Sequence, residues 1–273
     1  MKNYKKILIL LIVCFSQGFL FGQRNNTISL QPGLFVSLYK DEVSSPLTHW
    51  VPAIGINLGY QYESDFNIHK VNLSFAMGEA RNSISGTVSL SKYLDPESGE
   101  LIEEEYVRDK LNMNILIDYS YHRKIFERNS YSIYPGVAFN YTFNMQLSDY
   151  PTVNSYITLG PSVIQELKFS QRDNIRFSLS LPLLSYIVRP PFAGVDDELL
   201  NMVSTNPLKI YKTGQLMTVN KYFSLDLNVE YRHLFFPWLE GSIAFHSRYS
   251  YIAEPRPKRE FTFDLMPGIN FKF

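Results

Sequence analysis

The residues that could perform chemistry in this chain are charged side chains that recur at every second position of alternating segments. Carboxylates and histidine can act as general acids and bases, and opposite charges in a confined space can pair. Residues two apart in a β-strand face the same side, so we expect these side chains on one face of a sheet. We predict that they form an ion-pair and hydrogen-bond network with nearly balanced signs. Its members are Glu166, Lys168, Arg176, Asp226, Glu230, Arg232, His246, Arg248, Glu260, Asp264 and Lys272.

The spacing of histidine and serine does not favour a hydrolase. His246 and Ser247 are neighbours, so in a strand they face opposite sides. Barrel lipid hydrolases carry His and Ser two apart on one face. Residues 230–233 (EYRH) superficially resemble a segment of lipid A deacylases, but residues 234–236 (LFF) replace the small polar residues expected next. We therefore expect no catalytic residues.

Metal, nucleotide and nucleic-acid sites are also not expected. The acidic run Glu103–Glu105 fits no defined calcium loop, so we interpret it as a solvated charge run. The sequence contains no phosphate-binding loop, zinc spacing or nucleotide fingerprint. It has no polybasic stretch, and its formal net charge is zero. We expect no cofactor, no metal and no nucleic-acid partner.

Ten alternating segments must position the charged residues. Each has apolar residues on one face and polar residues on the other, which is the two-residue period of a β-strand. The polar face is too polar for a second sheet to pack on it, and in lipid only a closed barrel of strands satisfies every backbone group. We predict an all-β transmembrane antiparallel up-and-down barrel; the alternative, a soluble β-barrel, would bury the apolar face. The segments are residues 28–39, 51–62, 70–77, 111–121, 131–144, 157–169, 175–183, 223–232, 239–251 and 260–273.

The last segment, residues 260–273, alternates aromatic and polar residues and ends on an aromatic side chain. Its ending Gly268-x-x-Phe271-x-Phe273 resembles the assembly signal on the last strand of outer-membrane β-barrels. Met266 departs from that pattern, which prefers a polar residue there. The resemblance implies insertion into outer-membrane lipid and recognition by the barrel-insertion machinery. The 20 Phe and 19 Tyr suit a surface that meets lipid and headgroups.

Residues 1–22 have the features of a cleaved export signal. Three lysines precede an apolar run at residues 7–15, which is too short for a membrane span of ~20 residues. Cleavage after Gly22 would leave residues 23–273 as a single barrel domain. A lipoprotein anchored at Cys14 is the disfavoured alternative, because valine precedes this cysteine where a small residue is needed.

Alternate connections differ in length, which predicts the orientation of the barrel. Those after the second, fourth, sixth and eighth segments are generally compact, whereas the others are mostly longer and more polar. Outer-membrane barrels have short periplasmic turns and long external loops. We therefore expect both termini in the periplasm and long external loops at residues 78–109 and 188–220. The first loop has a weak strand pattern, and the second should hold a short helix over residues 196–203.

A non-enzymatic function is the main expectation. The protein would act through its external loops or as an accessory subunit of an envelope complex, with an envelope protein as partner. Eight strands give a filled interior and ~16–18 an open channel, so a narrow small-solute channel is the first alternative. A lipid or peptide hydrolase at the external rim is the second. Its candidate residues, by fold-level analogy with the ten-stranded omptin proteases, are Asp41, His49, Asp196 and Asp197 in external loops.

Overall fold

The computed structural model describes residues 26–43, 45–82, 87–94, 101–107, 110–147, 152–189 and 207–273. Most of these residues lie in strands, and within this part of the chain no helix is long and apolar enough to span a bilayer. The strands are β1 (Asn26–Asp41), β2 (Ser45–Glu63), β3 (Asn67–Ala80), β4 (Thr87–Leu94), β5 (Leu101–Val107), β6 (Lys110–Arg123), β7 (Phe126–Arg128), β8 (Tyr131–Leu147), β9 (Thr152–Lys168), β10 (Asp173–Ser180), β11 (Leu184–Val188), β12 (Gln215–Thr218), β13 (Tyr222–Phe236), β14 (Leu239–Ile252) and β15 (Lys258–Lys272). One 3-10 helix, η1 (Pro207–Thr213), precedes β12.

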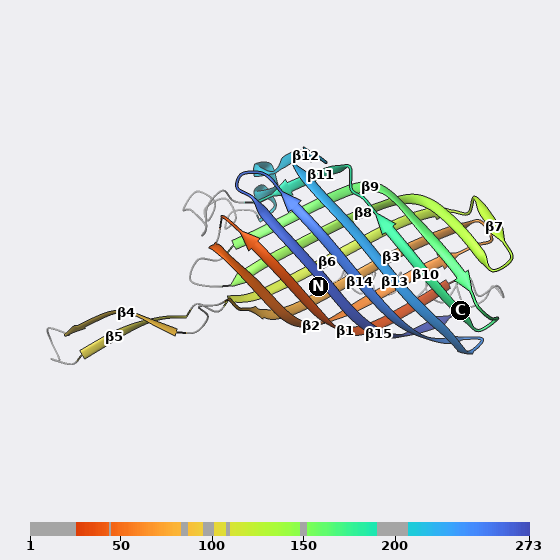
Figure 1. Cartoon of the computed structure of the whole chain (residues 1–273), viewed down its shortest axis with the longest axis horizontal. Helices are drawn as coiled ribbons and strands as arrows, with labels where there is room; N and C mark the ends of the chain where they lie inside the picture. Colours follow the sequence, from red (N-terminus) through yellow and green to blue (C-terminus); the bar gives the residue numbers. More distant parts are fainter. Residues whose placement is uncertain are drawn as a thin grey trace, which may run out of the picture.

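The strands close into one antiparallel barrel (Figure 1). Each wall strand pairs with its neighbours in chain order, and the pairing of β1 with β15 joins the first strand to the last. β10 and β11 both pair with β9, one after the other, and together form one wall strand. β12 and β13 likewise form the next wall strand, since β12 pairs with β11 and β13 pairs with β10. The predicted ten-stranded up-and-down barrel is therefore confirmed.

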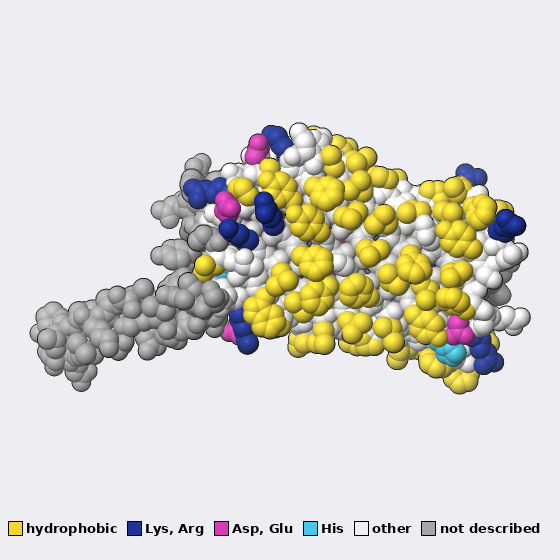
Figure 2. Space-filling model, viewed as in Figure 1, with side chains coloured by type: hydrophobic (Ala, Val, Ile, Leu, Met, Phe, Trp, Pro, Cys, Tyr) yellow, Lys and Arg dark blue, Asp and Glu magenta, His cyan; other side chains and the backbone are white. Residues whose placement is uncertain are grey.

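The apolar face of the wall points outward. Alternate Leu, Ile, Phe and Tyr side chains are exposed, up to 61% for Leu34 and 70% for Ile54. Figure 2 shows these side chains as a broad belt around the middle of the molecule, with charged side chains toward its two ends. Apolar side chains of this kind suit contact with lipid. The closed ladder of strands also suits a bilayer, because it gives most backbone groups a hydrogen-bond partner within the wall.

The two ends of the barrel differ. We call the end with the short connections β2–β3, β6–β8, β9–β10 and β13–β14 the turn end. Both described chain ends lie there, since the backbone groups of Asn26 and Phe273 hydrogen-bond to each other at 3.2 and 2.9 Å. The opposite end, which we call the loop end, carries the connections β1–β2, β3–β6, β8–β9, β11–β12 and β14–β15.

The two long connections contain structure of their own. In the first, β4 pairs with β5 in a separate two-stranded sheet, which Figure 1 draws beyond the loop end of the barrel. In the second, the described part contains η1 and then β12, which pairs with β11. The sequence does not predict β12. The helix expected at residues 196–203 and the export signal at residues 1–22 lie outside the described residues.

Candidate functional site

The charged side chains line the lumen in layers, and Arg176 on β10 is the centre of the layer at the turn end. Its Nε donates to Glu166 on neighbouring β9 at 2.8 Å, and its Nη2 donates to both oxygens of Glu63 on β2 at 2.9 and 2.7 Å. Lys168 Nζ lies 3.6 Å from Glu166, with half of its side chain exposed. Glu63 is not among the predicted inward residues, because it follows the predicted segment 51–62. Its position two residues after the inward Gln61 is the signal that could have found it.

Arg232 on β13 forms the next layer. Its Nη2 lies 2.6 Å from Oε2 of Glu230 and donates to Oε1 of Gln61 at 3.3 Å. Its Nε lies 3.7 Å from Glu240 on β14, and Lys272 Nζ on β15 lies 2.5 Å from the other oxygen of Glu240. Glu240 is fully buried and is not among the predicted residues, although it lies two positions before the inward Ser242 in the predicted segment 239–251.

His246 on β14 lies between two carboxylates in the middle of the lumen. Its Nδ1 is 2.9 Å from Asp264 on β15, and its Nε2 is 3.6 Å from Asp226 on β13. Arg248 pairs with the same Asp226. Nδ1 is within hydrogen-bond distance of its carboxylate, whereas Nε2 makes only the longer contact. His246, Arg248 and the two aspartates thus form one polar cluster in the lumen.

Lys258 and Glu260 on β15 form a pair nearer the loop end. Their charged atoms lie 2.8 Å apart, Lys258 Nζ donates to the Tyr156 hydroxyl at 3.3 Å, and Ser37 donates to Glu260 at 3.0 Å. Lys258 is only 3% exposed, although the sequence places it in a short loop. β15 begins at Lys258, two residues before the segment that its alternation predicts.

The two described rim candidates for a hydrolase lie in strands, so their predicted position in external loops is wrong. Asp41 ends β1, and His49 lies within β2, because both strands extend past the segments that their alternation predicts. His49 is buried and stacks on Tyr39 with ring centroids 5.2 Å apart, while Asp41 pairs with Arg189. Asp196 and Asp197 lie outside the described residues.

A second histidine approaches a serine but lacks the third member of a triad. His122 is predicted in a turn; it lies in β6, buried, with Nε2 3.0 Å from the Ser162 hydroxyl. That hydroxyl donates to the backbone oxygen of Leu179 at 3.2 Å, so it accepts from the imidazole. Among the described residues, His122 Nδ1 has no hydrogen-bond partner, so no described carboxylate orients the ring. Within the described residues, no group of three or more His, Cys, Asp or Glu side chains could hold a metal ion.

Three cavities follow one another along the lumen. The loop-end cavity measures about 140 Å³, the middle cavity about 120 Å³ and the turn-end cavity about 440 Å³. Glu230 and Arg248 border both the loop-end and the middle cavity, and Arg176 and Arg232 border both the middle and the turn-end cavity. Ion-paired side chains therefore partition the axial path.

Lys70 on β3 and Asp118 on β6 lie at the same partition without an ion pair among the described residues. They occupy diagonal positions on neighbouring strands, since Lys70 is opposite Ser120 and Asn72 is opposite Asp118. Both line the loop-end and the middle cavity. Asp118 is hydrogen-bonded instead: the amide nitrogen of Asn140 donates to its Oδ1 at 2.8 Å in the orientation that satisfies both side chains.

The loop-end cavity has a mixed lining. The strands β15, β1 and β2 contribute Met266, Phe35 and Val51 but also polar and charged side chains such as Gln31 and Asp264, and β6 and β8 contribute amide side chains. Among the described residues, four amide oxygens of lining residues are buried without a hydrogen-bond partner. They belong to Asn72, Asn114, Asn144 and Asn228.

The three residues of the assembly-signal pattern occupy the two faces of β15. Phe271 is 44% exposed on the outer face, where its ring stacks on Trp238 with centroids 6.5 Å apart. Gly268 faces the lumen, where a Cβ atom would collide with Gln31 of β1 and meet the Ser242 hydroxyl of β14 at 2.9 Å. Phe273 follows the last strand residue and hydrogen-bonds to Asn26.

Comparisons with known proteins support the fold. No family model and no curated protein matches the chain. Among solved structures, the outer membrane protease OmpT of Escherichia coli has a TM-score of 0.52 at 6% identity over 91% of this chain and 97% of that chain. The translocator domain of the autotransporter NalP from Neisseria meningitidis has a TM-score of 0.43 at 7% identity, over 99% and 96%. The COG4313 outer membrane channel of Pseudomonas putida F1 has 0.41 at 10%, over 90% and 94%. The chain has the fold of outer-membrane β-barrels.

Proposed function

We propose that this protein is a non-enzymatic outer-membrane barrel that acts at its loop end, through external loops or as an accessory subunit of an envelope complex. The loop end would face outward, because outer-membrane barrels place short turns in the periplasm and long loops outside. The outward apolar belt supports a position in the membrane. Both described chain ends would then lie in the periplasm.

The observation that carries this proposal is the set of ion-paired layers across the lumen. Separating the charges of Arg176 or Arg232 from their carboxylates would leave buried charges without partners, which is costly. A lumen partitioned in this way favours a scaffold over an open pore. Within the described part of the chain, the hairpin of β4 and β5 pairs only with itself, which would leave its edges available to a partner.

A pull-down under mild detergent tests the accessory role. The wild-type chain should retain one envelope protein in stoichiometric amount, and replacing residues 87–107 by a short Gly-Ser linker should release it. A matched variant with Gly-Ser residues in the turn at 64–66, at the other end of the barrel, should retain the partner. A wild-type chain that purifies alone as a monomer would count against the proposal.

A narrow solute path is the second candidate, because three cavities lie in series along the lumen. We expect no conductance steps from the wild type in planar bilayers. Replacing Arg176 and Arg232 by alanine should open the two turn-end layers and produce steps. Regular steps from the wild type itself would favour the channel over the scaffold.

A further inference from the structure

Two basic side chains lie opposite each other on the outer face of the wall, at the loop end. Lys40 of β1 is the register partner of Arg259 of β15. Both side chains are exposed, whereas their chain neighbours Tyr39, Asp41 and Lys258 are buried on the lumen side. Alternation therefore directs both cations outward. Like charges that lie directly opposite in a sheet destabilise it, so this position carries an unfavourable electrostatic contact.

No carboxylate of the described residues offsets this repulsion. Neither Lys40 nor Arg259 forms an ion pair within the described part of the chain. Asp41 and Glu260, the carboxylates next to them in sequence, are paired inside the lumen. Glu42, two residues after Lys40, forms no ion pair with either cation.

Other cations on the exterior of the loop end have acidic partners. Arg81 pairs with Glu79 at 3.0 Å, and Lys221 pairs with Glu254 at 3.0 Å. Between 47% and 52% of each of these side chains is exposed, so exposure to solvent does not prevent pairing here. The missing partner therefore distinguishes the two opposite cations from these pairs.

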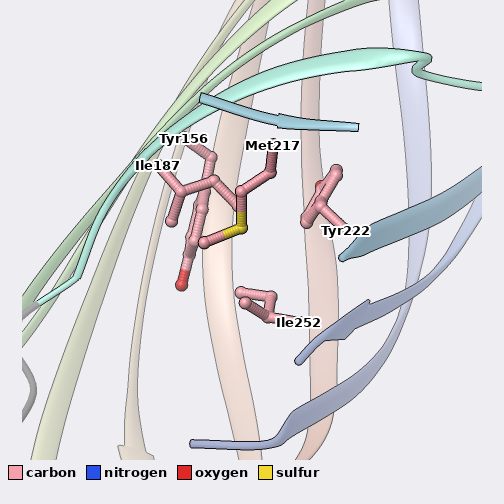
Figure 3. Packing of buried hydrophobic residues seen from close by; sticks show 5 residues of the cluster. All are labelled: Tyr156, Ile187, Met217, Tyr222 and Ile252. Carbon is pink, nitrogen blue, oxygen red and sulfur yellow. The ribbon is translucent and has the colours of Figure 1, made fainter. Parts of the chain in front are cut away.

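An apolar cluster fills the lumen behind this part of the wall. It consists of Tyr156, Ile187, Met217, Tyr222 and Ile252, all less than 8% exposed. Figure 3 shows Met217 between the pair Tyr156 and Ile187 on one side and the pair Tyr222 and Ile252 on the other. Ile252 is the register partner of Lys258, the residue before Arg259. Because the inner side is occupied at this level, an anion would reach the two cations from outside the barrel.

Hydroxyl groups flank the two cations on the neighbouring strands. Tyr251 of β14 is the register partner of Arg259, whose guanidinium lies 5.8 Å from the centre of the tyrosine ring. Thr48 of β2 is the register partner of Lys40. We call Thr48, Lys40, Arg259 and Tyr251 the basic row. Two cations and two hydroxyl donors in one row suit the oxygens of a phosphate group.

The basic row borders the apolar belt. The next outward row on the same four strands, toward the middle of the barrel, consists of Trp50, Leu38, Phe261 and Tyr249. These side chains are 40–45% exposed. Figure 2 shows several Lys and Arg side chains at this border of the belt. A ligand with an anionic head and apolar chains would contact both rows, whereas a free anion would contact only the basic row.

We infer that the basic row binds the phosphate group of a membrane lipid in the leaflet around the loop end. Arg259 would donate paired hydrogen bonds to the phosphate oxygens, and Lys40 would supply the second positive charge. The acyl chains would lie along the apolar row of Trp50 and Leu38. The phosphate would take the place of the carboxylate that the two cations lack, so the bound lipid would relieve their repulsion. This site lies on the wall and does not depend on the partner proposed for the loops.

Tryptophan fluorescence tests the site, because the chain has two tryptophans, one toward each end of the barrel. Trp50 lies beside the basic row and Trp238 in the turn between β13 and β14, with similar exposures of 45% and 48%. The full chain is reconstituted in phosphatidylcholine vesicles with a minor fraction of phosphatidic acid whose brominated chains quench nearby tryptophan. Trp238→Phe isolates the signal of Trp50, and Trp50→Phe isolates that of Trp238. We expect about 30-fold enrichment of phosphatidic acid at Trp50, as two cations near a membrane surface imply, and none at Trp238.

Two double variants in the Trp238→Phe background locate the binding groups. Lys40→Gln combined with Arg259→Gln should abolish the enrichment at Trp50. Arg81→Gln combined with Glu79→Gln is the matched control, because it removes a paired cation whose backbone bridges to that of Trp50. This control should keep the enrichment at the wild-type level.

A charge reversal gives an independent readout. Arg259→Glu places opposite charges in register with Lys40, so the urea midpoint in uncharged detergent should rise while the enrichment of phosphatidic acid is lost. The heat-dependent shift of the folded barrel on detergent gels verifies folding of each variant. Equal quenching of the two tryptophans in the wild type, or enrichment that persists without both cations, would overturn the site. Displacement of the brominated lipid by excess inorganic phosphate would overturn the lipid as its ligand, since the row would then bind free phosphate.

Discussion

Arg176 illustrates how single residues stabilise this lumen. Its guanidinium joins Glu166 on the adjacent strand to Glu63, which comes from the other side of the barrel interior. All three charges are shielded from bulk water to different degrees, with side-chain exposures of 10% for Arg176, 1% for Glu166 and 33% for Glu63. The contribution of such a charged group to the free energy of folding depends on its partners, because a buried charge that loses its partners destabilises the protein.

Arg176→Met should therefore destabilise the barrel by about 3–5 kcal/mol, because two carboxylates lose their main partner. The free energy of unfolding in urea, measured in detergent micelles, gives the effect. Arg81→Met is the matched control: Arg81 pairs with Glu79 on the surface, where such pairs contribute about 0–1 kcal/mol. Equal losses for the two variants would contradict the role assigned to Arg176.

Removing the charges of Arg176, Glu63 and Glu166 together distinguishes the cost of an unpaired buried charge from the contribution of side-chain packing. In the triple variant Arg176→Met, Glu63→Gln, Glu166→Gln, no charge of this set remains to be desolvated. Its unfolding free energy should lie closer to that of the wild type than that of Arg176→Met does. A triple variant less stable than the single one would show that packing, and not charge balance, governs this layer.

At the scale of elements, β15 matters because it contacts both neighbours through the lumen face. Gly268 lies against Gln31 of β1 and Ser242 of β14, so the absence of a side chain lets the three strands fit together. The alternation of β15 was predictable from sequence. β12 was not, because it has four residues and its partner β11 is separated from it by a long stretch of chain.

Gly268→Val should reduce the folded fraction after refolding, because a side chain added to a packed site costs about 1–3 kcal/mol. Ile269→Val, on the exposed outer face of the same strand, should have little effect. The ratio of folded to unfolded bands on unheated detergent gels measures both. Similar folded fractions would show that the lumen face of β15 tolerates a side chain there.

At the scale of the whole molecule, the barrel and the hairpin of β4 and β5 are separate sheets. The ten strands and their inward faces follow from a period of two, since lipid outside and water inside impose opposite requirements on neighbouring residues. The pairing across the lumen does not follow from it. Glu63 and Glu240 keep the two-residue spacing from inward Gln61 and Ser242, but alternation alone does not name their partners, which come from other strands. Arg189 follows the last residue of β11, where alternation no longer defines the face.

Removal of residues 87–107 should leave the barrel folded, because the hairpin has no ladder partner in the wall. The unheated gel band and the urea midpoint should match those of the wild type within error. This outcome is also needed to interpret the pull-down, since a misfolded barrel would lose any partner. A large loss of folded material would show that the hairpin contributes to assembly.

The hydrogen bonds between Asn26 and Phe273 place the first and last described residues side by side. A linker of a few residues could therefore join them, and new ends could be opened at the turn of residues 64–66, so that β3 would come first and β2 last. Such a circular permutant keeps every strand neighbour while moving the aromatic ending into the interior of the polypeptide. Its efficiency of membrane insertion would reveal whether insertion depends on the sequence of that strand or on its place as the last strand of the barrel.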